Sequence, residues 1–199
     1  MIQRPYHHGD LRSALLSRAE ETLREVGVDG LSLRELARDT GVSHGAPRRH
    51  FRDRGALLDA LAVEGFKRLH AALEEATSPV PGRTFEEALT AVAVAYVTFA
   101  TDNAALLELM FTSKHQVGAT SELREAADAS FATMAALVEE GQSTRELVPG
   151  DLERIGLVLF AMLQGITSLA NTKMIDSAQL QQLTGYAVDT LLHGLAPRD

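Results

Sequence analysis

The chain of 199 residues contains no cysteine and no tryptophan. Without cysteine it cannot form a disulfide framework or a thiolate zinc site, and it cannot use a cysteine nucleophile. The first ten residues hold no apolar stretch of the kind that a secretory signal needs, so we expect a cytoplasmic protein. Apolar residues make up 45% of the chain and charged residues 23%, a balance typical of a folded globular protein.

The sequence also lacks the strict apolar–polar alternation that half-buried strands show. Apolar residues instead recur at spacings of three and four, as on one face of a helix, beginning with Leu11, Leu15 and Ala19. Glycine and proline breaks and serine or threonine caps divide these stretches, so we expect an all-α protein of about nine helices. The expected helices span residues 11–26, 32–40, 43–51, 53 to the break at 77–82, 84–101, 104–112, 120–141, 151–172 and 177–195.

A net charge of −8 would by itself argue against binding to nucleic acid, but the charge is unevenly distributed. Residues 1–70 hold 12 of the 19 Lys and Arg and 10 of the 27 Asp and Glu, which gives a net charge of +2. The remaining residues hold 7 and 17, which gives −10. This asymmetry is compatible with a nucleic-acid-binding head on an acidic body, and equally with chance scatter.

Residues 41–45 match the G-x-S-x-G pattern of the hydrolase nucleophile elbow, which needs a strand before the serine. A capped helix precedes this segment instead, so we interpret Gly41 as a helix stop and Ser43 as a helix start. The seven histidines form neither an H-E-x-x-H motif nor a Glu-x-x-His pair. The sequence therefore predicts no catalytic site, no metal and no cofactor.

The two short helices expected at 32–40 and 43–51 are joined by a tight turn, which is the helix-turn-helix layout. A capping box formed by Ser32 and Glu35 marks the start of the first helix. The second helix and the residues after it carry four arginines against one aspartate. Because guanidinium matches phosphate oxygens and the guanine edge, the combination favours DNA binding over a merely solvated helix.

The residues around this turn resemble the DNA-binding domain of TetR-family transcriptional regulators. The match runs through VDGLSLRELA at 28–37 and GVSHGAPRRHFRDRGALL at 41–58, and it covers about residues 10–60. The arm YHHGDLR at 6–12 resembles the branch with a WHG-type C-terminal domain. The segments LMF at 109–111 and FAMLQG at 160–165 echo later motifs of that branch.

Some positions depart from the pattern of the family. The family usually has tyrosine at the position of Arg48 and lysine at the position of Arg54. The branch has tryptophan and histidine where this chain has Phe160 and Gln164, so a ligand role tied to those residues cannot be carried over.

The resemblance implies a repressor that a small molecule releases from a pseudo-palindromic operator. We expect residues 1–54 to form the DNA-binding domain with its N-terminal arm, and residues 55–199 to form the ligand-binding and dimerisation domain. Arg34 and residues 44–46 would face bases, and the other cations would mostly contact phosphates. The predicted contacts to the double-stranded DNA operator are Arg34, Thr40, His44, Gly45, Ala46, Arg48, Arg49, His50 and Arg54.

The run Ile155–Thr172 carries no charge over 18 residues, close to the lower limit for a membrane span. Polar residues such as Gln164 interrupt it, so we expect a buried helix and no membrane partner. The resemblance implies a homodimer through the last two helices, and burial against a second copy would explain the apolar composition. The apolar residues at helical spacing are Leu152, Ile155, Leu159, Met162, Ile166 and Leu169, and then Leu180, Leu183, Ala187, Leu191 and Leu195.

We predict an effector pocket within the fourth to eighth expected helices, where methionine and phenylalanine can line a cavity or simply fill a core. The candidate residues include no Lys or Arg, so a neutral, lipophilic small molecule is expected rather than an anion. Two alternatives stay open: a helical DNA-binding or interaction protein without an effector, and a small α-helical enzyme. The predicted lining residues are Val92, Tyr96, Phe99, Leu106, Met110, Phe111, Phe131, Met134, Phe160 and Gln164.

Overall fold

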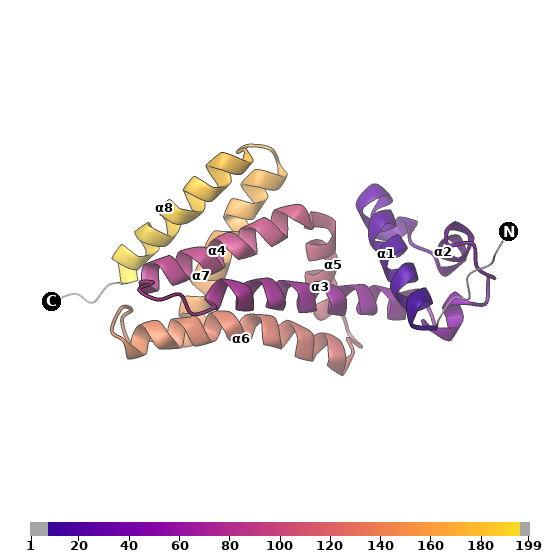
Figure 1. Cartoon of the computed structure of the whole chain (residues 1–199), viewed down its shortest axis with the longest axis horizontal. Coiled ribbons are helices and arrows are strands. Elements are labelled where there is room, and N and C mark those ends of the chain that lie inside the picture. The colour runs from indigo at the N-terminus through magenta and orange to yellow at the C-terminus, as the bar shows by residue number, and fades with distance from the viewer. Residues whose placement is uncertain (1–7, 196–199) are drawn as a thin grey trace. The chain divides into compact units, whose positions relative to one another are not determined.

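The computed structural model describes residues 8–195, and within that range it contains helices and no strand (Figure 1). Eight α-helices and two short 3-10 helices cover this part of the chain, which confirms the all-α class and is close to the nine helices expected. The α-helices are α1 (His8–Val26), α2 (Leu33–Asp39), α3 (Arg54–Thr77), α4 (Phe85–Asp102), α5 (Ala104–Lys114), α6 (Ser121–Ser143), α7 (Leu152–Asn171) and α8 (Ser177–Leu195), and the 3-10 helices are η1 (Val28–Gly30) and η2 (Pro47–Arg49).

The third expected helix, over residues 43–51, contains the 3-10 helix η2 and no α-helix, so that prediction was wrong in type. An α-helix starting at Ser43 would need the N–H of residue 47 to bond to the Ser43 carbonyl, and Pro47 has no N–H. The Ser43 carbonyl instead accepts from the N–H of Ala46, at 2.9 Å. The N–H of His50 bonds in the same i to i+3 pattern to the Pro47 carbonyl, at 3.0 Å.

The chain divides into two compact units. The first takes in the chain up to Gly65 together with Ala105–Glu125, and the second takes in Phe66–Ala104 and the chain from Ala126 onward. Helix α3 therefore contributes its first half to one unit and its second half to the other. The functional division expected at residue 54 stays a prediction.

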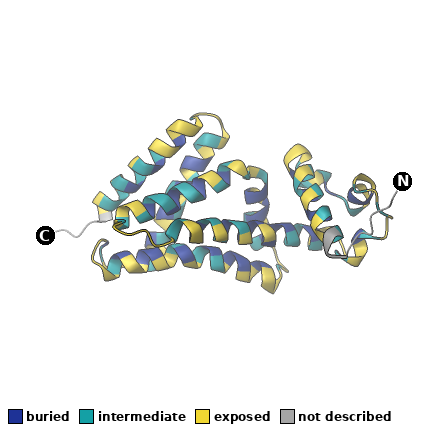
Figure 2. Ribbon diagram, in the orientation of Figure 1, coloured by how far each residue is buried: buried dark blue, intermediate teal, exposed yellow. Residues whose placement is uncertain are grey.

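In the first unit, α1 packs against α2 and η1, and α2 packs against η2. An ion pair joins the Arg18 guanidinium of α1 to the Asp39 carboxylate at the end of α2, at 3.2 Å. The hydrogen bond from Arg18 holds the pKa of the Asp39 carboxyl below its usual range. One side of each helix is buried (Figure 2). The buried apolar residues of this part of the unit include Leu15, Ala19, Leu23, Leu31, Leu36, Ala37, Phe51, Leu57 and Leu61.

In the second unit, α4 packs against α7 and α8, which also pack against each other. The predicted capping box at the start of α4 is present. The Thr84 hydroxyl oxygen accepts from the Glu87 N–H at 3.2 Å, and the Glu87 carboxylate accepts from the Thr84 N–H at 2.8 Å. These two bonds satisfy donors that the first turn of a helix otherwise leaves without partners.

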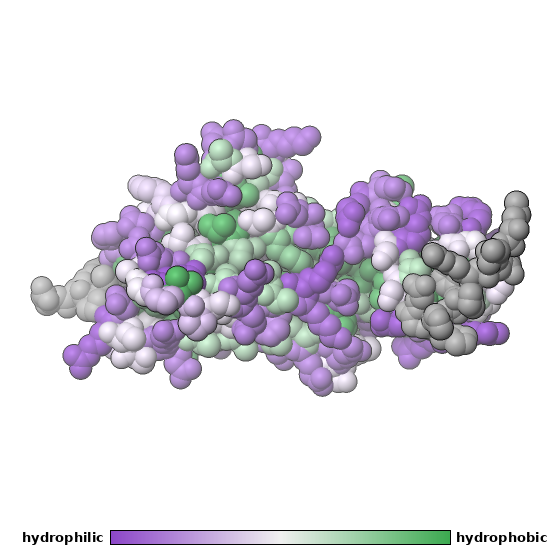
Figure 3. Space-filling view, viewed as in Figure 1, coloured by the Kyte–Doolittle hydropathy of each residue, from purple (hydrophilic) through white to green (hydrophobic). Residues whose placement is uncertain are grey.

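Helix α4 is buried on one face, although its charge-free sequence predicts burial nearly all round. Val92 and Tyr96 are buried, whereas Val94 and Phe99 are only partly covered and Thr98 is exposed. The space-filling view shows apolar surface over this helix (Figure 3). Apolar composition alone therefore overestimates how much of α4 the single chain covers.

A glycine allows close packing at the C-terminal end of α6. A Cβ atom at Gly141 would overlap the Phe85 ring and lie 2.9 Å from a Leu147 methyl carbon. Real Cβ atoms do not approach other heavy atoms so closely, so a larger residue at this position would force the Phe85 or Leu147 side chain to move.

Helix α7 has one apolar face inside the chain and a second one exposed. Ile155, Leu159 and Ile166 are buried, so much of the stripe that we predicted as a dimer interface packs within the chain. The exposed apolar residues are instead Leu157, at 64% exposure, and Val158, at 51%. By length and composition α7 alone could cross a membrane among the helices described, and 28% of its apolar window is buried.

Candidate DNA interface and effector pocket

The turn after α2 has the geometry that the sequence predicts for a helix-turn-helix. Gly41 has a positive φ of 68°, a conformation that glycine adopts without strain. The N–H of Val42 bonds to the Ala37 carbonyl at 2.9 Å, and the N–H of Gly41 bonds to the Arg38 carbonyl at 3.1 Å. These are the bonds of a Schellman motif, which ends a helix and reverses the chain. A helix precedes Ser43, so the nucleophile-elbow interpretation fails.

Three arginines around this turn are exposed and lie in positions from which they can contact a ligand outside the fold. Arg34 lies in the first turn of α2, and Arg48 and Arg49 form the last two residues of η2. Within the described residues no hydrogen bond or ion pair holds any of the three guanidinium groups. His44, in the turn itself, is exposed as well. The site therefore presents cationic and polar groups that are available to phosphates and bases.

Arg54, which the sequence predicts as a phosphate contact, uses its guanidinium inside the fold. Its Nε donates to the Leu31 carbonyl at 2.9 Å, and one of its terminal nitrogens donates to the Val28 carbonyl at 2.5 Å. The same terminal nitrogen lies 3.8 Å from the Asp29 carboxylate. Arg54 thereby ties the start of α3 to η1 and to Leu31, the residue that follows η1.

Thr40 and His50, two other residues predicted to contact DNA, interact with other residues of the chain. The Thr40 hydroxyl donates to the Leu36 carbonyl at 2.6 Å, which helps to end α2. His50 is partly covered and lies with its ring centroid 6.5 Å from that of Phe51. The Phe51 ring also contacts the Arg12 guanidinium, whose central carbon lies 5.6 Å from the ring centroid, a cation–π distance. Gly45 is exposed and Ala46 is partly covered. In the predicted arm, residues 6 and 7 lie outside the described residues.

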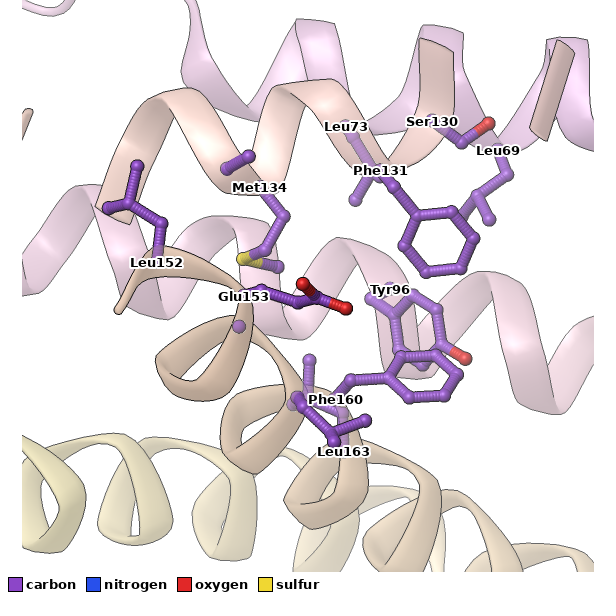
Figure 4. Close-up of a pocket in the computed structure, with 13 residues that line it drawn as sticks. Leu69, Leu73, Tyr96, Ser130, Phe131, Met134, Leu152, Glu153, Phe160 and Leu163 are labelled. Atoms are coloured by element: carbon purple, nitrogen blue, oxygen red, sulfur yellow. The ribbon is translucent and has the colours of Figure 1, made fainter. Parts of the chain in front are cut away.

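The second unit contains a cavity of about 500 Å³, within the range of small-molecule sites. Side chains of α3, α4, α6 and α7 line it, and most of them are apolar (Figure 4). The lining residues are Leu69, Leu73, Tyr96, Ser130, Phe131, Met134, Ala135, Leu152, Glu153, Gly156, Leu157, Phe160 and Leu163.

A hydrogen bond joins α4 to α7 at this cavity. The Tyr96 hydroxyl donates to the side-chain carbonyl of Gln164 at 2.9 Å. Burial raises the pKa of the Tyr96 hydroxyl above its ordinary value, so the group stays protonated and remains a donor. The Ser130 hydroxyl donates to the carbonyls of Phe66 and Ala126, at 3.0 and 3.1 Å. Both hydroxyl groups of the lining thus have partners within the chain.

The structure brings four of the ten predicted pocket residues to the cavity: Tyr96, Phe131, Met134 and Phe160. Gln164 reaches it only through its bond to Tyr96. The remaining five residues do not line the cavity, namely Val92 and Phe99 on α4 and Leu106, Met110 and Phe111 on α5.

The α5 residues belong to the first unit, where they have a packing role instead. Leu106 and Met110 are buried, and a Cβ atom at Gly65 would lie 2.6 Å from the Met110 sulfur. The absence of a side chain at Gly65 therefore makes the space that Met110 fills. Large apolar residues look alike in sequence whether they line a cavity or fill a gap.

Sequence reasoning missed the remaining lining residues, among them Leu69, Leu73 and Glu153. The two leucines lie four residues apart in the helix expected from residue 53, a spacing typical of any buried helix face, and a glutamate in the first turn is expected at any surface helix. No pattern in the sequence distinguishes these positions from core or solvated ones.

Two family models match the chain. The model described as "Bacterial regulatory proteins, tetR family" matches residues 15–61, which include the helix-turn-helix. The model described as "Tetracyclin repressor-like, C-terminal domain" matches residues 89–191, about half of the chain. The chain belongs to the TetR family of transcriptional regulators. The finer assignment to the WHG-type branch stays a prediction.

Among solved structures, a protein of unknown function from Rhodococcus sp. RHA1 is 50% identical, with a TM-score of 0.89 over 98% of this chain and 100% of that chain. The regulator FadR of Bacillus subtilis, solved in complex with stearoyl-CoA, has a TM-score of 0.74 over 92% of this chain and 98% of that chain. At 17% identity that likeness shows a shared fold.

Among curated relatives, the class D tetracycline repressor of Escherichia coli is 42% identical over 59 residues. The match covers 30% of this chain and only 27% of the length of that repressor. TetR-family regulators bind DNA operators, form dimers and bind small-molecule effectors.

Proposed function

We propose that this chain is a repressor that binds a pseudo-palindromic DNA operator as a homodimer and leaves it when a small molecule binds. The observation that carries the proposal is the exposed set of Arg34, Arg48 and Arg49 around a helix-turn-helix, without partners in the described residues. Each of these side chains can neutralise a phosphate or reach a base edge without first breaking a bond within the chain. A regulator of this kind acts in the cytoplasm, where its operator is.

The contacts to DNA divide into two kinds by their position. Arg34 and residues 44–46 would face base edges, because small residues at the turn allow the backbone to approach the major groove closely. Arg48, Arg49 and His50 would contact phosphates and fix the register. We place Thr40 and Arg54 behind this surface, since their side chains already bond to carbonyls of the fold.

The dimer would use the faces of α7 and α8 that the single chain leaves exposed. Val158 of α7 is 51% exposed and Tyr186 of α8 is 70% exposed. Large apolar side chains on two adjacent helices are costly to leave in water, and a second copy of the same surface would cover them. A two-fold axis through such an interface would explain a pseudo-palindromic operator.

The effector would occupy the cavity of the second unit and act by population shift. If the ligand prefers a state whose two DNA-binding heads do not match the half-site spacing, ligand and DNA weaken each other reciprocally. Among the residues that the structure describes, no Lys, Arg or His lines the cavity, so the effector is lipophilic and not an anion. Leu69 and Leu73 of α3 touch this cavity, and the same helix begins at Arg54.

The test is DNase footprinting of the purified chain on the DNA upstream of its own gene. A protected pseudo-palindrome, lost in the Arg48→Ala plus Arg49→Ala double variant but retained in a Glu139→Gln control, would support the proposal. If neither this region nor a genomic selection yields a protected sequence, DNA-dependent regulation is refuted. Protection that no compound relieves would favour a DNA-binding protein without an effector.

A further inference from the structure

The described lining of the cavity in the second unit includes one carboxylate, that of Glu153. Glu153, an exposed residue in the first turn of α7, is the only charged residue among the described lining side chains, and no hydrogen bond or ion pair holds its carboxylate within the described residues. Figure 4 shows its carboxylate pointing toward the region where the rings of Tyr96, Phe131 and Phe160 gather. A cavity whose other described lining residues carry no charge therefore has one solvent-exposed carboxylate in its wall.

The three aromatic rings form the second part of the site. The ring centroids of Tyr96 and Phe160 lie 6.0 Å apart, and those of Phe131 and Phe160 lie 5.7 Å apart. Both pairs are tilted edge to face, at 70°. Aromatic faces attract cations through their quadrupole, and clusters of rings recognise quaternary ammonium groups.

The other polar groups of the lining do not compete for this role. The hydroxyls of Tyr96 and Ser130 already donate to acceptors in the chain. The lining within residues 8–195 includes no lysine, arginine or histidine. An anionic group in this cavity would meet the Glu153 carboxylate and find no cation to offset its desolvation.

We propose that the effector of this chain is a lipophilic cation, a protonated or quaternary amine on an apolar body. Its cationic group lies between the Glu153 carboxylate and the rings of Tyr96, Phe131 and Phe160, and its apolar part lies along Leu69, Leu73 and Leu163. The inference rests on the proposed function, because it assigns the ligand class of the same pocket. It replaces the neutral effector that the sequence predicts, since Glu153 was absent from the predicted lining.

The place of Glu153 in the first turn of α7 does not by itself explain why its side chain points into the cavity. A glutamate in the first turn of a helix is favoured by the helix dipole wherever it points. In α7 the orphan N–H groups of Glu153 and Arg154 already bond to the Asp151 carboxylate, at 3.0 and 3.2 Å. The direction of the Glu153 side chain into an aromatic cavity is the observation that favours a ligand.

The experiment compares three probes that share a ten-carbon chain: decyltrimethylammonium, decanol and decanoate. Affinity is measured by calorimetry, and release from the footprinted operator by fluorescence anisotropy of labelled DNA. We expect decyltrimethylammonium to bind about tenfold more tightly than decanoate, because attraction to one carboxylate replaces repulsion. Only the cation should release the DNA at low concentration.

Two variants separate the charge from the rings. Glu153→Gln should weaken binding of the cation by about two- to fivefold, the range for an exposed ion pair, and leave decanol unchanged. Phe131→Leu keeps an apolar side chain but removes a ring, so it should weaken the cation more than decanol. Glu139→Gln, an exposed glutamate on α6 outside the cavity, serves as the matched control.

The outcomes distinguish the two proposals. Decanoate binding as tightly as the cation, or a cation affinity that Glu153→Gln leaves unchanged, overturns the inference. A chain that binds its operator but none of the three probes overturns it too and leaves DNA binding intact. Failure to bind any operator refutes the proposed function, whatever the probe affinities.

Discussion

Arg54 offers the sharpest test of how the arginines of the helix-turn-helix are divided between folding and DNA binding. Sequence reasoning assigns it to a phosphate, whereas the structure shows its guanidinium donating to the Val28 and Leu31 carbonyls. Replacing Arg54 by alanine removes both bonds and leaves these two carbonyls to be satisfied by water. We expect the main effect to be on stability.

The size of that effect follows from the bonds and their exposure. Hydrogen bonds from a charged donor contribute about 1.5–3 kcal/mol each when they are shielded from water. The Arg54 side chain is 43% exposed, so we expect a total loss of only about 1–2 kcal/mol. For a chain of this length that lowers the melting temperature by about 2–8 °C. Circular dichroism measures it directly.

The matched comparison is Arg49→Ala. Arg49 is exposed in η2 and has no partner in the described residues, so its loss should leave the melting temperature nearly unchanged. If Arg49 contacts a phosphate, the slope of log K against log salt falls in magnitude by about 0.9 for each protomer, or about 1.8 for the proposed dimer. Anisotropy titrations between about 50 and 200 mM salt resolve such a change.

For Arg54→Ala we expect the salt slope of the wild type, measured well below the melting temperature. The reverse result, an unchanged melting temperature with a slope smaller by about 1.8 for the dimer, would refute the reasoning and restore the phosphate contact predicted from the sequence. Arg54→Lys keeps the charge but loses the fork that spans both carbonyls, so it should recover only part of the stability.

Three further expectations can be checked with simple variants. Arg34→Ala should relax preference at one operator position, by about 1–3 kcal/mol, in binding assays on singly substituted operators; uniform weakening at all positions would make it a phosphate contact. Val158→Asp should convert a micromolar dimer to monomer in sedimentation velocity, because it places a charge in the proposed interface; an unchanged dimer would move the interface elsewhere. Gly141→Ala should destabilise by about 1–3 kcal/mol through its clash with neighbouring side chains, whereas Gly156→Ala, with nothing within 4 Å of its Cβ position, should stabilise by about 0.5–1 kcal/mol. Equal melting temperatures for these two glycine variants would contradict the packing argument.

Local chemistry in the sequence was sufficient for most of the helices and for the turn of the helix-turn-helix. Gly41 ends α2 because a glycine at that position adopts a positive φ, and Ser32 and Thr84 start helices because their hydroxyls accept from N–H groups three residues on. These are interactions between neighbours along the chain, so the sequence contains all of their participants. The family assignment depends on the same short-range run of residues.

The one element predicted with the wrong type had its cause in the sequence as well. Pro47 removes the N–H that an α-helix over residues 43–51 would need, and the segment forms a 3-10 helix instead. The Ser43 carbonyl, which has no donor at residue 47, accepts from the N–H of Ala46 in an i to i+3 bond. Pro47 itself is buried in η2.

Tertiary packing decided which long side chains are available for function. Nothing in the sequence separates Arg54, whose donors meet carbonyls 23 and 26 residues away, from Arg49, which meets none in the described residues. Met110 fills the space beside Gly65, while Met134 lines the cavity. Glu153 gains its proposed role only because folding brings three rings from α4, α6 and α7 together beside it. Contacts between residues far apart along the chain depend on how the helices pack, and a periodic apolar pattern fixes which face is buried but not what that face meets.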